Sequence, residues 1–363
     1  MRHSIAIATY NRPDYLRRCL ASLLAADHPD SSWEVLVMDN SDEAFRQRNA
    51  AVVRETQDER VRHIRMSSFG LMAARHEGVE AARGDLVSFV DEDVQVQASW
   101  FEGVYDAMMD GDVELVTGPI LPSYEAPPPH WLDSLWVGSG SGRIHGYLAI
   151  LDLGSAFLRI SPKLVFGANF SFRRETFISV GGSNPDAFPP QWELYQGNGE
   201  TALAIRIGAA SGNAVYEPRC IVRHSVPLSR LNVGYFQWRA RCFGMEASYT
   251  ELRREHGLGP GEGVPLVCSP TGTSWTRRAR ARLRPTWLGR TKRQVSSVFA
   301  RRHAVLDDFP DIQNALHIAR RDGYETHRAA ATRDPVLMEW ILRPNYLGVN
   351  GELPLMPQAG TRP

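Results

Sequence analysis

The chain has 363 residues, enough for one large domain or two smaller ones. Apolar residues make up 43% of it, which excludes wholesale disorder. Basic and acidic residues number 41 each, and this balance disfavours a uniformly basic nucleic-acid binder. The N-terminus does not resemble a signal peptide, no apolar run is long enough to span a membrane, and the 4 cysteines form no C-x-x-C pair. These features predict a cytoplasmic protein with reduced thiols.

The N-terminal third alternates short apolar runs with segments of helical spacing. We expect strands at residues 4–9, 33–39, 62–66 and 85–90. Helices are expected after Pro13, which suits a first helical turn, and over residues 71–83. This alternation predicts an α/β fold built on a doubly wound sheet.

The pattern changes after residue 118. Proline-rich and Ser/Gly-rich stretches predict loops at residues 119–129 and 139–142. Short strands are expected at residues 167–172, 214–216 and 220–223, and a helix at 201–208. We interpret this part as an α+β extension that completes the site.

The C-terminal third is expected to be helical and basic. It divides into a packing helix within residues 229–255, a Gly- and Pro-rich linker at 256–275, and an extension at 276–363 with short helices near 309–322 and 335–342. Ten basic residues and no acidic one lie between Arg277 and Arg302. Such a segment can attract an anionic acceptor, a membrane surface or a nucleic acid, or it can be a solvated helix face that pairs with acids elsewhere. No nucleic-acid partner and no membrane span are expected, whereas peripheral membrane contact and self-association stay open.

Polar residues follow three of the expected strands. They are T-Y-N-R at residues 9–12, D-N-S-D at 39–42 and D-E-D at 91–93. Sheets of this kind bind ligands at the carboxyl ends of their strands. An ordinary turn is the alternative at each of them, because Asn and Asp favour turns.

The third strand end carries Asp91, Glu92 and Asp93. Side chains alternate along an extended chain, so Asp91 and Asp93 are expected to point the same way and Glu92 to point away. Two carboxylates on one side repel unless a cation lies near them, and Mg²⁺ or Mn²⁺ takes such oxygen ligands together with substrate phosphates. The spacing favours a metal–diphosphate site over a solvated acidic turn.

From about residue 4 to about residue 248 the sequence resembles family 2 of the glycosyltransferases, inverting enzymes with a GT-A fold. The N-terminal motifs that carry this resemblance are I-A-I-A-T-Y-N-R at residues 5–12, V-M-D-N-S at 37–41, G-L-M-A-A-R-H-E-G at 70–78 and V-D-E-D at 90–93. His76 stands where the family usually has asparagine. The resemblance implies a GT-A catalytic domain over residues 1–228, with a nucleotide-sugar half at 1–118 and an acceptor half at 119–228.

Later motifs extend the resemblance. They are F-G-A-N-F-S-F-R-R at residues 166–174, V-G-G at 180–182, G-E-T-A-L-A-I-R-I at 199–207 and V-R-H-S-V-P at 222–227. Glu200 lies six residues before Arg206, where the family has its catalytic aspartate. Gly199 replaces the acidic residue that precedes that aspartate, so one carboxylate remains where the family has two.

The resemblance implies a nucleotide-diphosphate sugar donor, a hydroxyl-bearing acceptor, and Mn²⁺ or Mg²⁺ as cofactor. It assigns Asp93 and His224 to the metal and Glu200 to deprotonation of the acceptor hydroxyl. The residues that it assigns to the nucleotide are Thr9, Tyr10, Arg12, Asp39 at the base, Arg75, and Asp91 at the ribose. Ordinary structural roles remain the alternative for Arg75, His224 and Glu200, since surface arginines, buried histidines and helix-capping glutamates are common.

Acceptor recognition is assigned to three tryptophans and one amide, because sugars and apolar groups both stack on aromatic faces. These residues are Trp131, Trp136, Asn169 and Trp192. Packing in the core is the alternative for each tryptophan.

Two other functions are weighed against glycosyl transfer. A sugar-nucleotide nucleotidyltransferase would carry a glycine-rich phosphate loop after the first strand, and residues 9–13 contain no glycine. A degenerate binding module without activity is disfavoured by the retained carboxylates and His224. Processive synthesis is disfavoured as well, because Gln237-Trp238-Arg239 lacks the spacing of the Q-x-x-R-W signature.

Overall fold

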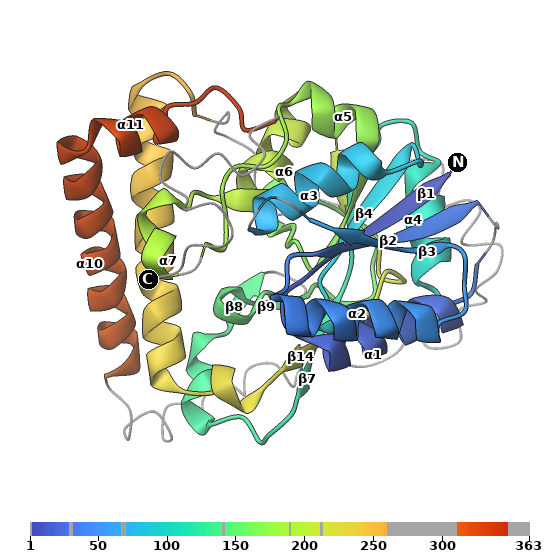
Figure 1. Ribbon diagram of the computed structural model, residues 1–363. Coiled ribbons are helices and arrows are strands. Elements are labelled where there is room, and N and C mark those ends of the chain that lie inside the picture. The colour runs from blue at the N-terminus through green and yellow to red at the C-terminus, as the bar shows by residue number, and fades with distance from the viewer. Residues whose placement is uncertain are drawn as a thin grey trace.

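The computed structural model describes residues 2–28, 32–66, 68, 70–139, 142–188, 190–210, 213–259 and 311–347 (Figure 1). The basic segment between Arg277 and Arg302, and the predicted linker beyond residue 259, lie outside these described residues. None of the helices within them combines the length and the apolar character that crossing a membrane requires.

The larger sheet is a mixed sheet with a parallel centre. In spatial order its strands are β11 (Leu158–Ile160), β13 (Asn213–Tyr216), β6 (Val113–Thr117), β12 (Asn169–Arg173), β4 (Leu86–Val90), β1 (His3–Thr9), β2 (Trp33–Asp39) and β3 (Val61–Arg65). Strands β4, β1, β2 and β3 run parallel, whereas β12 runs antiparallel to its neighbours β4 and β6. The α/β class is confirmed. Because β1 and β4 are parallel neighbours, the residues that follow them meet at one edge of the sheet.

Helices cover both faces of this sheet. They are α1 (Pro13–Ala25), α2 (Glu43–Glu55), α3 (Leu71–Ala81), α4 (Trp100–Met108), α5 (Arg174–Ser179) and α6 (Gly199–Ala210). Figure 1 shows α1 and α2 on one face and α3, α5 and α6 on the other. Helix α1 buries Leu16, Leu20 and Leu23, which share one face at helical spacing. Helix α2 was not predicted, because it buries few apolar side chains and its sequence shows no such stripe.

A second sheet extends the first at the carboxyl edge of β4. Its strands, in spatial order, are β5 (Val94–Val96), β14 (Val222–Val226), β7 (Ile120–Tyr124), β10 (Ile150–Asp152), β9 (Gly142–His145) and β8 (Val137–Ser139). The short 3₁₀ turns between elements are η1 (His130–Leu135), η2 (Gly146–Leu148), η3 (Pro162–Leu164), η4 (Pro190–Tyr195) and η5 (Leu228–Arg230). The loop predicted over residues 119–129 was wrong at its start, because β7 pairs with β14 on one side and with β10 on the other.

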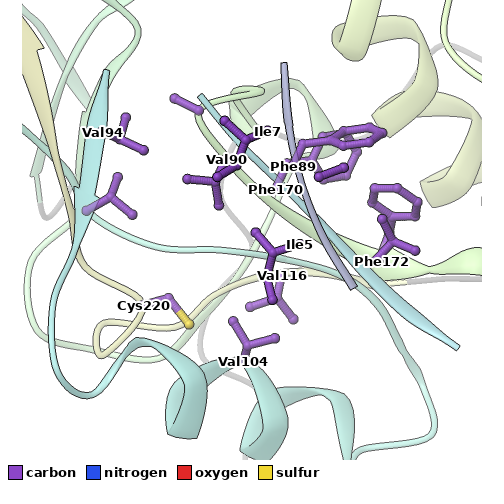
Figure 2. Packing of buried hydrophobic residues seen from close by; sticks show 14 of the residues in the cluster. Ile5, Ile7, Phe89, Val90, Val94, Val104, Val116, Phe170, Phe172 and Cys220 are labelled. Carbon is purple, nitrogen blue, oxygen red and sulfur yellow. The ribbon is translucent and has the colours of Figure 1, made fainter. Parts of the chain in front are cut away.

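The main core lies between the first sheet and its covering helices. Figure 2 shows Ile5 and Ile7 of β1 beside Phe89 of β4 and Phe170 and Phe172 of β12. All five side chains are at most 2% exposed. Burial of each such side chain contributes about 1.5–3 kcal/mol, so the central strands are held firmly and fix the site-bearing ends of β1 and β4.

Three C-terminal helices pack beside the site, namely α7 (Val233–Glu255), α10 (Ile312–Arg333) and α11 (Pro335–Ile341). A side chain at Gly244 of α7 would overlap the backbone of Arg320, and one at Gly323 of α10 would overlap the backbone of Arg241. These two glycines let α7 and α10 approach at backbone distance. Helix α10 continues beyond the predicted end near residue 322, because Gly323 marks a close contact and not a helix end.

Candidate active site

A cleft of about 560 Å³ lies at the carboxyl edge of β1 and β4. Its walls come from the turns after these two strands, the start of α3, the loop at residues 183–188, the start of α6, β14, η5 and the first turns of α7. The structure brings eight of the predicted residues to this cleft, and these are Thr9, Tyr10, Arg12, Arg75, Asp91, Asp93, Glu200 and His224.

The predicted orientation of Glu92 was wrong. Asp91-Glu92-Asp93 forms a turn, closed by a hydrogen bond from the Val94 N–H to the Asp91 carbonyl at 3.2 Å, and all three carboxylates line the cleft. Alternation of side chains holds only for an extended chain, and the strand ends at Val90. The Glu92 carboxylate accepts hydrogen bonds from the Thr9 hydroxyl and, at 3.3 Å, from the Tyr10 N–H. Burial raises the pKa of Glu92 to about 8, against the opposing hydrogen bond from Thr9.

Asp93 is surrounded by cationic and imidazole groups. Its Oδ2 accepts a hydrogen bond from Arg230 Nη2 at 2.9 Å and lies 3.4 Å from Arg12 Nη1. Its Oδ1 lies 3.4 Å from His224 Nε2. Burial alone would raise the pKa of Asp93, but His224 and the two guanidinium groups outweigh it and hold that pKa well below its ordinary value. Asp93 is therefore an ionised carboxylate.

The residue types around Asp93 fit a divalent cation. A carboxylate and an imidazole both ligate Mn²⁺, and their separation of 3.4 Å lets both reach one ion. Arg230 already bridges them, since its Nη1 lies 3.1 Å from His224 Nε2 while its Nη2 contacts Asp93. Across the described ranges, no group of three or more His, Cys, Asp or Glu side chains is arranged around one point. Asp93 and His224 would hold such a cation in place of their contacts with Arg230.

The other end of the cleft centres on Arg75 of α3. Its Nη1 donates to Glu200 Oε2 at 2.9 Å, and its Nη2 lies 3.8 Å from Asp91 Oδ1. The Gly167 N–H donates to Glu200 Oε1 at 3.2 Å. Arg75 is 4% exposed, so it is not the surface arginine that the alternative interpretation requires.

Glu200 has a second carboxyl beside it that the sequence did not reveal. Asp186, in the loop at residues 183–188, forms a side-chain hydrogen bond with Glu200. Burial would raise the pKa of Glu200, but the charge of Arg75 and the hydrogen bond from Asp186 lower it to about 2. Burial and the Glu200 charge hold the pKa of Asp186 well above its ordinary value. These opposite directions favour the ionised form of Glu200 and the protonated form of Asp186.

Asp39 lies beneath the cleft and not in its wall. It is fully buried, its Oδ2 lies 2.7 Å from His63 Nε2, and its Oδ1 accepts from the Ser41 N–H at 2.9 Å. The carboxylate of Asp39 thus holds the turn after β2 in place. The neighbouring Asn40 is the β2-end residue that lines the cleft.

None of the four residues assigned to the acceptor lines the cleft. Trp131 packs edge-on against Phe236, and Trp192 packs against Tyr195. Trp136 packs against His145. The Asn169 amide is committed to two partners, the indole N–H of Trp100 and the carbonyl of Cys220.

Besides Tyr10, four aromatic residues line the cleft. They are Tyr147 of η2, Phe188, and Tyr235 and Trp238 of α7, with Arg239 beside them. Trp238 is 41% exposed, so its ring is available to a ligand. The sequence carries one signal for these residues, the aromatic–arginine pair at 238–239, although its spacing does not match the processive motif.

This architecture is the GT-A glycosyltransferase fold. A mannosyltransferase from Pyrobaculum calidifontis, PcManGT, solved in complex with GDP-Man and Mn²⁺, superposes with a TM-score of 0.53 at 16% identity, over 92% of this chain and 87% of that one. Residues 4–181 match the model of the family described as glycosyl transferase family 2, and the chain belongs to that family.

Two curated relatives are similar over most of the chain. The succinoglycan biosynthesis protein ExoM of Rhizobium meliloti is 22% identical over 277 residues, which are 74% of this chain and 81% of that protein. The glucosyl-dolichyl phosphate glucuronosyltransferase of Haloferax volcanii is 23% identical over 257 residues, which are 69% of this chain and 78% of that protein.

Proposed function

We propose that this glycosyltransferase moves a single sugar from a nucleotide-diphosphate sugar to an acceptor hydroxyl, with inversion at the anomeric carbon and with Mn²⁺ or Mg²⁺ as cofactor. The observation that carries the proposal is the cleft itself. It joins a cationic region around Asp93 to an ionised carboxylate, Glu200, that comes from the far half of the chain.

The donor nucleotide is assigned to the turns after β1 and β4. Thr9 and Tyr10 offer a hydroxyl and an aromatic ring, and Asp91 offers a carboxylate to the ribose hydroxyls. Asp39 supports this side from beneath through the turn after β2. The structural neighbour that holds GDP-Man and the relative named as a glucuronosyltransferase support a nucleotide-sugar donor.

The diphosphate is assigned to the cationic region. Arg12 and Arg230 lie beside Asp93, and Asp93 with His224 would hold the cation. When bound, such a cation offsets the charge that develops on the leaving diphosphate. The two guanidinium groups offer further hydrogen bonds to phosphate oxygens once they leave Asp93.

Glu200 is assigned as the base. The acceptor oxygen forms a bond to the anomeric carbon while the bond from that carbon to the diphosphate oxygen breaks, and Glu200 takes the hydroxyl proton. A pKa near 2 keeps Glu200 ionised at neutral pH. The acceptor proton becomes strongly acidic as the new bond forms, so a weakly basic carboxylate can accept it. A positioned base contributes about 10²–10⁴-fold, and a single displacement inverts the anomeric centre.

The acceptor is assigned to the side of the cleft formed by η2 and α7. Tyr147, Tyr235 and Trp238 present aromatic faces there, on which sugar rings and apolar groups stack. The acceptor region thus extends beyond residue 228 into α7. Gln237 is exposed on the helix and does not line the cleft, which supports non-processive transfer.

A screen of UDP- and GDP-sugars tests this function. Hydrolysis of each sugar is measured with Mn²⁺, with Mg²⁺ and with EDTA, and transfer is then measured with a panel of p-nitrophenyl glycosides as acceptors. The proposal expects at least one nucleotide sugar to be turned over in a metal-dependent way, with an anomeric product of inverted configuration by NMR. A retained configuration would overturn the inverting mechanism, and turnover undiminished by EDTA would overturn the metal dependence.

A further inference from the structure

The start of α6 leaves space that a carboxyl group from another segment fills. A β-carbon at Gly199 would lie 2.5 Å from the Asp186 Cγ and would overlap its Oδ2. Gly199 also has a backbone φ of +39°, which side-chain-bearing residues rarely adopt. The position before Glu200 is therefore kept free of a side chain, and the Asp186 carboxyl occupies that volume.

The loop that carries Asp186 is held firmly against α6. The Pro185 carbonyl accepts from the Gly197 N–H at 2.9 Å and from the Gly199 N–H at 3.3 Å. His76 Nε2 accepts from the Ser183 N–H at 3.0 Å. These contacts fix the backbone just before Asp186, at Pro185 against α6 and at Ser183 against α3.

We propose that Asp186 is a positioning residue for the catalytic carboxylate Glu200, and that it supplies from a separate loop the second carboxyl that the Gly199 position lacks. This inference rests on the proposed role of Glu200 as the base. Asp186 donates its proton to Glu200, while Arg75 donates to Glu200 Oε2 and the Gly167 N–H to Oε1. The three donors together fix the plane of the Glu200 carboxylate.

The charges around the pair decide where its proton lies. Arg75 faces both carboxyls and favours their ionised forms. Glu246 of α7 faces both Asp186 and Glu200, whereas Asp91 faces Glu200. The negative charges of Glu246 and Asp91 disfavour ionisation of both carboxyls of the pair at once.

Arg239 of α7 lies near Asp186 and Glu246 and partly offsets their charge. Together these charges favour the ionised form of Glu200 and the protonated form of Asp186.

Asp186→Asn and Asp186→Ala separate this role from a structural one. Asn keeps a donor for Glu200, whereas Ala removes it. We expect Asp186→Asn to keep transfer within about threefold and Asp186→Ala to lower kcat about tenfold or more, because a hydrogen bond to a charged group contributes about 1.5–3 kcal/mol. KM for the nucleotide sugar should be unchanged in both variants.

The pH profile of kcat is the decisive readout. With Asp186 present, the pKa of Glu200 stays low. The acidic limb of the profile, where kcat falls because Glu200 becomes protonated, therefore lies at low pH. Loss of the donor in Asp186→Ala raises the pKa of Glu200, so its acidic limb should move to higher pH, while that of Asp186→Asn should not. Asp152→Ala is the matched control. Asp186 Oδ1 accepts from the Ala187 N–H at 2.8 Å, and Asp152 Oδ1 likewise accepts from the Gly154 N–H at 3.1 Å but lies outside the cleft.

A relocation of the carboxyl tests the geometry directly. The double variant Asp186→Gly/Gly199→Asp returns a carboxyl to the α6 start. Glycine is needed at 186 because the Asp186 Cβ would itself lie 2.7 Å from a β-carbon at Gly199, and aspartate at 199 tolerates a positive φ better than most residues. We expect it to recover at least part of the activity that Asp186→Ala loses, whereas Gly199→Ala alone should lose activity because its side chain displaces Asp186.

The outcomes distinguish this inference from the proposed function. If Glu200→Gln loses transfer but Asp186→Ala matches the wild type in rate and pH profile, the positioning role is wrong and the base assignment stands. If Glu200→Gln transfers normally, the base assignment itself fails. Circular dichroism and the midpoint of thermal unfolding show whether each variant is folded. If Asp186→Ala does not fold, Asp186→Glu replaces it as the test. Because the longer side chain changes the contact with Glu200, Asp186→Glu should shift the acidic limb of the kcat–pH profile or slow transfer.

Discussion

The two ends of the cleft carry opposite excesses of charge. At the end formed by β5, β14 and η5, the carboxylate of Asp93 lies between Arg12, Arg230 and His224. At the end formed by α3 and α6, carboxyls outnumber arginines. Arg75 and Arg239 lie there among the four carboxyls of Asp91, Asp186, Glu200 and Glu246.

The difference follows the chemistry that each end would perform. A leaving diphosphate brings negative charge, and it is stabilised where cations outnumber carboxylates. An ionised carboxylate takes the hydroxyl proton. It needs enough positive charge nearby to stay ionised, but too many ion pairs would keep it from contacting the acceptor. One cleft thus separates leaving-group stabilisation from proton removal by distributing arginines unevenly.

Glu200→Gln should have the largest effect, because it removes the base and keeps the size and hydrogen bonding of the side chain. Transfer should fall by about 10²-fold or more, while the affinity for the nucleotide sugar stays the same. Initial rates of transfer and calorimetric donor binding measure both quantities. A near-normal rate would show that Glu200 is not the base, and the two ends of the cleft would then not differ in function as proposed.

Asp93→Ala should abolish the part of nucleotide binding that depends on Mn²⁺. We expect the gain in UDP or GDP affinity on adding Mn²⁺ to fall by about 10²-fold, since even residues behind a metal ligand contribute 10–100-fold to metal affinity. Without metal, the affinity of Asp93→Ala for the nucleotide should be equal to or higher than that of the wild type. Arg12 and Arg230 lose their carboxylate partner and become available to the phosphates. Calorimetry with and without EDTA measures this, and an unchanged Mn²⁺ effect would remove Asp93 from the metal site.

Gly167→Ala should disturb the acidic end alone. A β-carbon there would overlap Arg75 Nη2 and lie 3.2 Å from Glu200 Oε1. Displacement of Arg75 removes one charged hydrogen bond from Glu200, so kcat should fall about tenfold with Mn²⁺ affinity unchanged. The matched control is Gly111→Ala, because a β-carbon at Gly111 would contact nothing within 4 Å.

Trp238→Ala should have the smallest effect and should act on the acceptor. Its exposed ring lines the cleft, so its loss should raise KM for an aromatic or sugar acceptor several-fold, about 1 kcal/mol, with donor KM unchanged. Trp136→Ala is the control, since Trp136 packs against His145 outside the cleft. If KM for the acceptor rises more in Trp136→Ala than in Trp238→Ala, Trp136, which the sequence predicted, binds the acceptor instead of Trp238.

The sequence predicted the N-terminal strands well because each is an apolar run that becomes a buried parallel strand. The residues at the ends of β1 and β4 could be placed together for the same reason, since neighbouring parallel strands end at one edge. Asp186 and Arg230 could not be found, because each lies in a short irregular segment whose position depends on contacts with distant elements. The acceptor tryptophans were chosen by residue type alone, and residue type does not distinguish a ring packed on Phe236 or Tyr195 from one that faces a cleft.

The division of charge between the two ends is tested most directly by titrating UDP and GDP, each with and without Mn²⁺, into the wild type, Arg230→Ala and Glu200→Gln. Arg230 lies at the cationic end and Glu200 at the acidic end. In the absence of metal, we expect the affinity of the preferred nucleotide to fall about tenfold in Arg230→Ala, the worth of one or two charged hydrogen bonds, and to change less than about twofold in Glu200→Gln. An equal loss in both variants, or a loss only in Glu200→Gln, would contradict the assignment of the diphosphate to the arginine-rich end.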